Sequence, residues 1–130
     1  MGAAGQSNSY NVAIGYYASK LITTGNSNVA IGYYAGYTNT TGGNSVLIGY
    51  QAGFTMNHTD ANGTIAIGYQ AGKAITSGRY NTAMGYQALL TEDDGEFNTA
   101  IAHQELKSQI NILETILRNY IPVIEKKEEN

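Results

Sequence analysis

Carboxylates are the first side chains in this sequence that could do chemistry. Four of them gather in one turn-like stretch, as Glu92, Asp93, Asp94 and Glu96. Two carboxyl groups at a suitable separation could serve a glycosidase as acid and base, and their oxygens could hold calcium. The cluster lacks the spacing of a known calcium loop. We therefore interpret it as a solvated turn and predict neither catalysis nor a metal there.

The two histidines, His58 and His103, stand apart and have no cysteine neighbours, because the chain contains no cysteine. A metal site at His103 would need three copies of the chain around a three-fold axis. The sequence also has no phosphate-binding loop and no nucleophile elbow. We expect no enzyme activity, no cofactor and no metal.

The most regular residues that could bind a ligand are tyrosines. One column comprises Tyr16, Tyr33, Tyr50, Tyr69 and Tyr86 and ends at His103, and beside it runs Tyr17, Tyr34, Gln51, Gln70, Gln87 and Gln104. Stacked rings and glutamine ladders could simply stabilise a stack. Exposed tyrosines could instead form a binding stripe, for example for carbohydrate. Both interpretations stay open.

These columns are set by an internal repeat. The pentapeptides VAIGY, VAIGY, VLIGY, IAIGY, TAMGY and TAIAH begin at Val12, Val29, Val46, Ile65, Thr82 and Thr99, at steps of 17, 17, 19, 17 and 17 residues. Self-similarity at one period is typical of a solenoid. The sequence predicts an all-β parallel solenoid, or β-roll, of about six 17-residue coils.

In five of the six copies, two β-branched or large residues flank an alanine, and in the third copy Leu47 takes the place of the alanine; this alternation is a strand pattern. We expect one short strand per copy, with the Val/Ile/Thr and Ile/Met columns inside and glycine or asparagine at the turns between strands. The longer step places an outward loop between Phe54 and Gly63. Because solenoid insertions often mark a binding face, His58 and Asp60 in this loop are further candidate binding residues.

The periodicity changes after Ala102. Apolar residues then follow a heptad seam of Leu106, Ile110, Leu113, Leu117, Tyr120 and Ile124. We predict a solenoid body over 1–102 and, over 103–130, a helix beginning near Gln104 and interrupted by Pro122. So short a helix needs partners. Assembly through a trimeric coiled coil is preferred to a cap folded on the chain's own solenoid.

The composition limits the kinds of partner that we expect this chain to bind. The net charge is −3, and more than half of the charged residues follow Ala102. A body with so little charge gives no basic footprint for nucleic acid. No run approaches the length that spans a bilayer, so membrane insertion is not expected.

The repeats resemble those of trimeric autotransporter adhesin heads (YadA-like) and the kindred N-T-A-I-G-Y-Q-A-G arrays of phage tail fibres. Segments 28–32, 64–72 and 81–88 carry the likeness best. It implies a homotrimer of parallel β-rolls with a coiled coil at one end, located in a virion tail fibre or on a cell surface. The implied function is host or cell-surface attachment through a glycan or protein receptor. A purely structural spacer, or a glycan-binding solenoid without catalysis, is the alternative. The G-Y-Q-A-G form favours a tail fibre.

Overall fold

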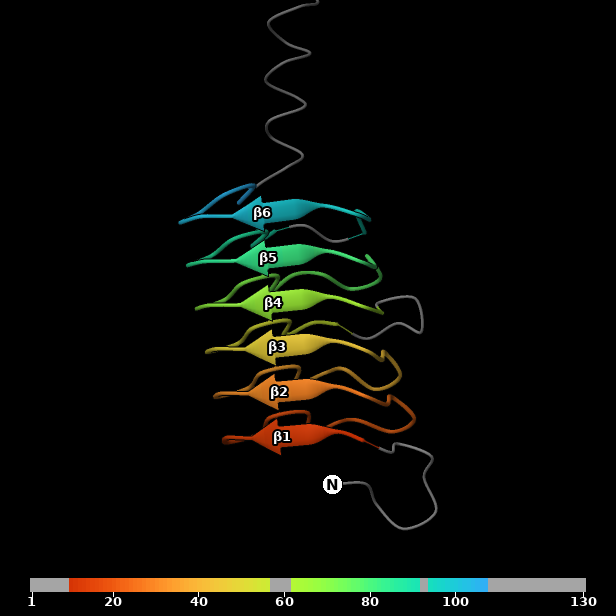
Figure 1. Ribbon diagram of the computed structural model, residues 1–130. Helices are drawn as coiled ribbons and strands as arrows, with labels where there is room; N and C mark the ends of the chain where they lie inside the picture. The colour runs from red at the N-terminus through yellow and green to blue at the C-terminus, as the bar shows by residue number, and fades with distance from the viewer. Residues whose placement is uncertain (1–9, 57–61, 92–93, 108–130) are drawn as a thin grey trace, which may run out of the picture.

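The repeats fold into one stack of coils. The computed structural model describes residues 10–56, 62–91 and 94–107. Each coil contributes one three-residue strand, and the six strands are β1 (Val12–Ile14), β2 (Val29–Ile31), β3 (Val46–Ile48), β4 (Ile65–Ile67), β5 (Thr82–Met84) and β6 (Thr99–Ile101). They lie side by side in chain order (Figure 1). The predicted all-β parallel solenoid is confirmed, with about five turns and no helix among the described residues.

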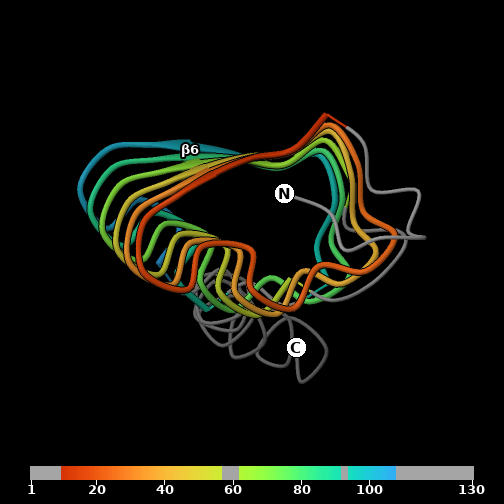
Figure 2. The ribbon, with the colours of Figure 1, turned by 90° about the horizontal axis from the view of Figure 1, so that it is seen from below.

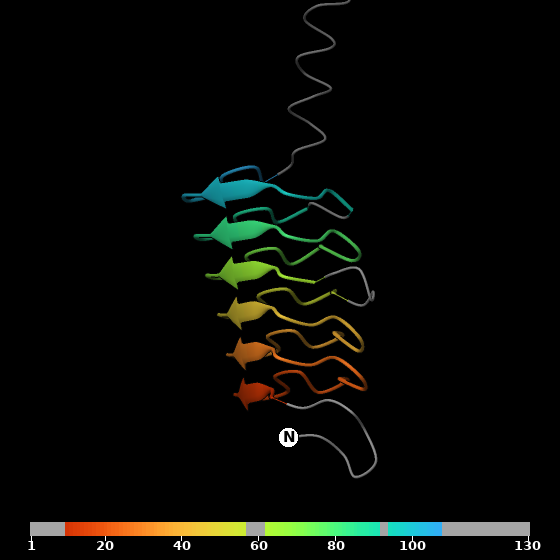
Figure 3. The same cartoon turned by 45° about the vertical axis from the view of Figure 1, so that its right-hand side comes forward.

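Each residue pairs with its counterpart one repeat later. Val12 lies opposite Val29, and Val46 lies opposite Ile65 across the longer step of 19 residues. The insertion therefore leaves the register intact. Viewed along the stack in Figure 2, successive coils follow the same course, each turned slightly from the one before, and Figure 3 shows them stacked one above another.

The interior is lined by alanine, which corrects the prediction that the β-branched columns point inward. The central strand residues Ala30, Leu47, Ala66, Ala83 and Ala100 are fully buried, as are Ala35, Ala52, Ala71 and Ala88 on the segment that follows. The flanking Val/Ile/Thr and Ile/Met side chains lie on the outer face, exposed or half-buried. The space within a coil is narrow, so the small member of the alternating pattern fits inside and the large members cannot.

A few large side chains complete the core, and glycine makes room for them. A Cβ on Gly53 would lie 2.7 Å from Cδ2 of Leu47 and 2.9 Å from Sδ of Met56. Likewise, a Cβ on Gly72 would lie 2.9 Å from Cδ1 of Ile75. In the fifth coil the equivalent of these glycines is Leu89, which is itself fully buried. The third and fourth coils are thus filled by Met56 and Ile75, and the fifth by Leu89.

Buried polar side chains link consecutive coils ahead of the strands. The Asn28 amide donates to the carbonyl of Gly42 at 2.8 Å, and its oxygen accepts from the Ser45 backbone N–H at 3.0 Å. Asn81 donates in the same way to the carbonyl of Gly95 at 2.7 Å. These bonds satisfy backbone groups that would otherwise be buried without partners.

The glycine that ends each strand permits close contact between coils. Gly68 has φ +133°, and a Cβ built there would lie 2.5 Å from the Gly85 carbonyl oxygen. Any other residue at this position would press directly on the next coil. Ala102 occupies the equivalent position in the sixth coil, after the last strand that the structure describes, and does not share the positive φ of the glycines.

Candidate binding and assembly surfaces

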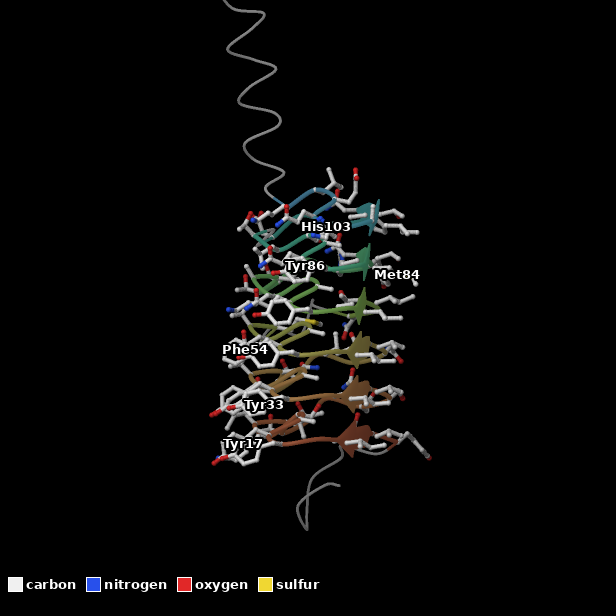
Figure 4. The ribbon with its side chains drawn as sticks, turned by 90° about the vertical axis from the view of Figure 1, so that its left-hand side faces the viewer. Tyr17, Tyr33, Phe54, Met84, Tyr86 and His103 are labelled. Atoms are coloured by element: carbon white, nitrogen blue, oxygen red, sulfur yellow. The ribbon has the colours of Figure 1, made fainter. Side chains whose placement is uncertain are left out.

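The predicted tyrosine column forms a continuous ring stack. Consecutive rings from Tyr16 to His103 are stacked, with centroids 5.4, 5.3, 5.1, 5.0 and 5.1 Å apart and interplanar angles of 2–14°. Each tyrosine follows the glycine after its strand, and His103 follows Ala102 at the same position, so the coil register brings the rings together (Figure 4). The tyrosines remain 40–58% exposed. The column is both a structural ladder and an accessible surface.

This stacking decides what the column can offer to a ligand. Neighbouring rings cover each other's faces, so a sugar cannot stack on a ring face within the column. The rings present their edges and hydroxyl groups, and these repeat along the stack at the ring spacing. The surface can therefore act through a row of hydroxyl groups.

The second column continues that polar row in the later coils. The side-chain amide of Gln70 donates to Gln51 at 2.9 Å, that of Gln87 donates to Gln70 at 3.0 Å, and that of Gln104 donates to Gln87 at 3.0 Å. All four glutamines have φ between 53° and 55°. Each amide in the middle of this ladder donates one N–H to one neighbour and accepts a hydrogen bond from the other. It therefore has a second N–H and a second oxygen lone pair for another partner.

In the first two coils, Tyr17 and Tyr34 take the place of the amides. Tyr34 packs against Tyr37 at 4.8 Å between centroids, and Tyr37 stacks on Phe54 at 5.4 Å. Lys20 places its Nζ 3.7 Å from the centroid of Tyr17, within the range of a cation–π interaction. The polar row thus begins in an aromatic cluster.

Hydrogen bonds, charge and burial shift the pKa values of three phenols in that cluster. The hydrogen bond between Tyr16 and Tyr17 raises the pKa of Tyr16 to about 12 and lowers the pKa of Tyr17. Hydrogen bonding and charge from Lys20 lower the pKa of Tyr17 further. Desolvation raises the pKa of Tyr34, with a smaller contribution from Tyr33. Tyr17 is therefore the first of these phenols to ionise.

The outer face of the sheet is a second surface, and it is apolar. Its two columns are Val12, Val29, Val46, Ile65, Thr82 and Thr99, and Ile14, Ile31, Ile48, Ile67, Met84 and Ile101. Ile14 is 59% exposed and Ile101 is 61% exposed. Figure 4 shows the Met84 side chain pointing away from the coils. Sequence reasoning missed this face by placing it inside. The alanine at the middle of five of the six strands was the signal that could have identified it.

Only some of the remaining candidate residues lie in the part of the chain that the structure describes. His58 and Asp60, and Glu92 and Asp93, lie outside the described residues. Glu96 forms an ion pair with Arg79, with 3.0 Å between Oε1 and Nε. Among the described residues, no three histidine, aspartate or glutamate side chains come together as a metal site.

The predicted heptad seam begins differently from expectation. Gln104 and Leu106 have φ of 55° and 47°, so the turn after β6 continues through them and no helix begins at Gln104. Leu106 packs against the solenoid core. The other five seam residues, from Ile110 to Ile124, lie outside the described residues. Within the described part of the chain there is no helix that could cross a bilayer.

Comparisons with known proteins identified no similar protein. A scan against protein-family models and searches of curated proteins and of solved structures gave no match to this chain.

Proposed function

We propose that this chain is a segment of a homotrimeric attachment fibre, as in a phage tail fibre or a surface adhesin, with the outer face of the sheet at the trimer interface. The single observation that carries the proposal is the apolar outer face. Apart from Thr82 and Thr99 on the outer side of β5 and β6, both faces of the strands are apolar, a pattern typical of parallel sheets that are covered on both sides. Large exposed apolar patches mark interaction surfaces.

The energetics favour a copy of the same chain as the cover. Complete burial of a Val or Ile side chain contributes about 1.5–3 kcal/mol, so a half-exposed one contributes about 1 kcal/mol. Two such columns run the length of the sheet, so their sum is large even after the cost of association. A regular face built by a repeat is best matched by an equally regular face.

A cyclic arrangement fits the rest of the chain. A symmetry axis parallel to the stack would bring the C-terminal segments of all copies together at one end. The predicted heptad seam from Ile110 onward would then meet its counterparts. Three copies, rather than two, follow the resemblance to trimeric adhesin heads and tail fibres.

The native molar mass of the full chain, measured by light scattering, tests the proposal. We expect a trimer for the full chain. Changing Ile31 and Ile67 to Lys places charges on the outer face and should give monomers that keep their β-sheet circular dichroism. Tyr80→Lys, on a different exposed column, should remain trimeric. A monomeric full chain, or a trimer unaffected by the two lysines, would contradict the proposal.

A spacer without a ligand is the second candidate. It is favoured by the tyrosine stack, in which the ring faces are taken up by neighbouring rings instead of being free for a ligand. A spacer would show no dependence of receptor binding on the tyrosine hydroxyl groups.

A further inference from the structure

The tyrosine and glutamine columns of the last four coils form one regular polar surface. It consists of Tyr50, Tyr69, Tyr86 and His103, with Gln51, Gln70, Gln87 and Gln104 beside them. Ring spacings of 5.0 and 5.1 Å hold this part of the stack in register. We call this surface the hydroxyl–amide row.

We infer that the hydroxyl–amide row binds a linear chain of β-1,4-linked pyranose sugars laid along the solenoid axis, one sugar per coil. This inference rests on the proposed attachment role and names the class of receptor that the role would use. Equatorial 1,4-linkages make a nearly straight polymer that advances by about the length of one coil per sugar. Successive sugars in such a chain are turned over relative to each other, so its groups repeat at every second sugar and meet every second coil in the same orientation.

The chemistry of the row suits such a polymer. Each coil offers a glutamine amide with a spare N–H and a spare oxygen lone pair. The first three coils of the row add a phenolic hydroxyl that can donate and accept, and the last adds the His103 ring. Sugar hydroxyl groups need both kinds of partner. The row contains no lysine, arginine, aspartate or glutamate, which favours an uncharged chain.

The period excludes an extended peptide along the same line. A β-strand advances by about 3.3 Å per residue and repeats every second residue, so its groups would lose register with the coils. An α-helix has a pitch of about 5.4 Å, which is close to the coil spacing. Its backbone hydrogen bonds are internal, however, and its side chains present no repeated hydrogen-bonding group.

The row also stays accessible in the proposed trimer. In Figure 4, Met84 points outward from the sheet, and Tyr86 and His103 lie to one side of it on the adjoining face. The tyrosines from Tyr50 to Tyr86 are 40–44% exposed. Assembly through the sheet would leave this row on the outside of the fibre.

Calorimetric titration of the full chain with cello-oligosaccharides and chito-oligosaccharides, from disaccharide to hexasaccharide, tests the inference. We expect the tetrasaccharide of at least one series to bind about tenfold more tightly than its disaccharide, with little further gain beyond it. The two series distinguish a plain glucan from an N-acetylated glycan. Malto-oligosaccharides coil because their linkage is axial, and should bind at least about tenfold more weakly.

The variant that tests the site changes Tyr50, Tyr69 and Tyr86 to Phe. It removes the hydroxyl groups but keeps the ring stack, so we expect native circular dichroism and a loss of at least about tenfold in tetrasaccharide affinity. Tyr80→Phe is the matched control, since Tyr80 is exposed and stacks on Phe97 in another column. Its affinity should be unchanged.

Three results would overturn the inference: no binding in either β-1,4 series, affinity that does not depend on length, or binding that survives the three tyrosine changes. The proposed fibre role is tested by a different result. A trimer that binds no such glycan removes the inference alone, whereas a monomeric chain removes the assembly proposal whatever it binds.

Discussion

Replacing Asn39 by Leu should make this protein more stable, although it removes a polar residue from a conserved-looking repeat. Asn39 is fully buried, and its side-chain nitrogen and oxygen have no hydrogen-bond partner among the described residues. At the equivalent position the neighbouring coils carry Ile22, Met56 and Ile75. Leucine is branched at the same carbon as asparagine and is close to it in shape.

The magnitude follows from two contributions. An unsatisfied buried polar group costs about 1–3 kcal/mol, and a buried leucine contributes about 1.5–3 kcal/mol relative to leaving it exposed. Allowing for imperfect fit, we expect Asn39→Leu to raise the free energy of unfolding by about 3 kcal/mol. Urea unfolding followed by circular dichroism would measure this, at one protein concentration because assembly also affects stability.

Asn28 provides the matched control. It is also a fully buried asparagine, but its amide nitrogen and oxygen bond to Gly42 and Ser45. Asn28→Leu would leave both backbone groups without partners and should lower stability by about 3 kcal/mol. If Asn39→Leu is as destabilising as Asn28→Leu, then the Asn39 amide is satisfied, for example by a buried water, and the reasoning is refuted.

Three further predictions concern the packing and the phenols. Gly68→Ala should lower stability by about 3 kcal/mol or more in urea unfolding, since its Cβ would meet the Gly85 carbonyl at a positive φ; an unchanged midpoint would show that the coils can separate locally. Leu47→Ala should cost about 2–5 kcal/mol in the same assay, because Leu47 is fully buried, and a cost near zero would mean that the interior collapses around it. In an alkaline titration of phenolate absorbance, the first step should lie below pH 10.0 and disappear in Tyr17→Phe. The lowered pKa means that Tyr17 stabilises the folded form above pH 10.0 and loses this effect as pH falls through the folded pKa. The raised pKa of Tyr16 does not lower stability below pH 10.0, lowers it progressively as pH rises from 10.0 to about 12, and keeps it lowered above that. A first step that survives in Tyr17→Phe would contradict this assignment.

The surfaces follow from the same repeat in different ways. Tyrosine at one position of each coil becomes a stack because parallel register places equivalent residues above one another. Sequence alone left open whether this column is buried or exposed. The structure shows that it is half-exposed with its ring faces covered, and this changes the chemistry expected of it from ring stacking to hydrogen bonding.

Periodicity by itself determined the coil, the strand positions, the register and the columns. These properties depend on local spacing, and one period repeated along the chain leaves a single way to align the copies. The insertion after Phe54 did not disturb this, because Val46 and Ile65 keep their pairing. The sequence alone therefore predicts correctly which residues lie above one another in successive coils.

Only the tertiary structure decided which side of each strand is inside. An alternating pattern with apolar residues at all positions does not say which face is buried, and hydrophobicity alone pointed to the larger residues. The closed coil has room for alanine and for a few larger side chains such as Leu47 and Leu89. Volume, which depends on how the chain closes on itself, therefore placed Val and Ile outside and created the apolar face proposed for assembly.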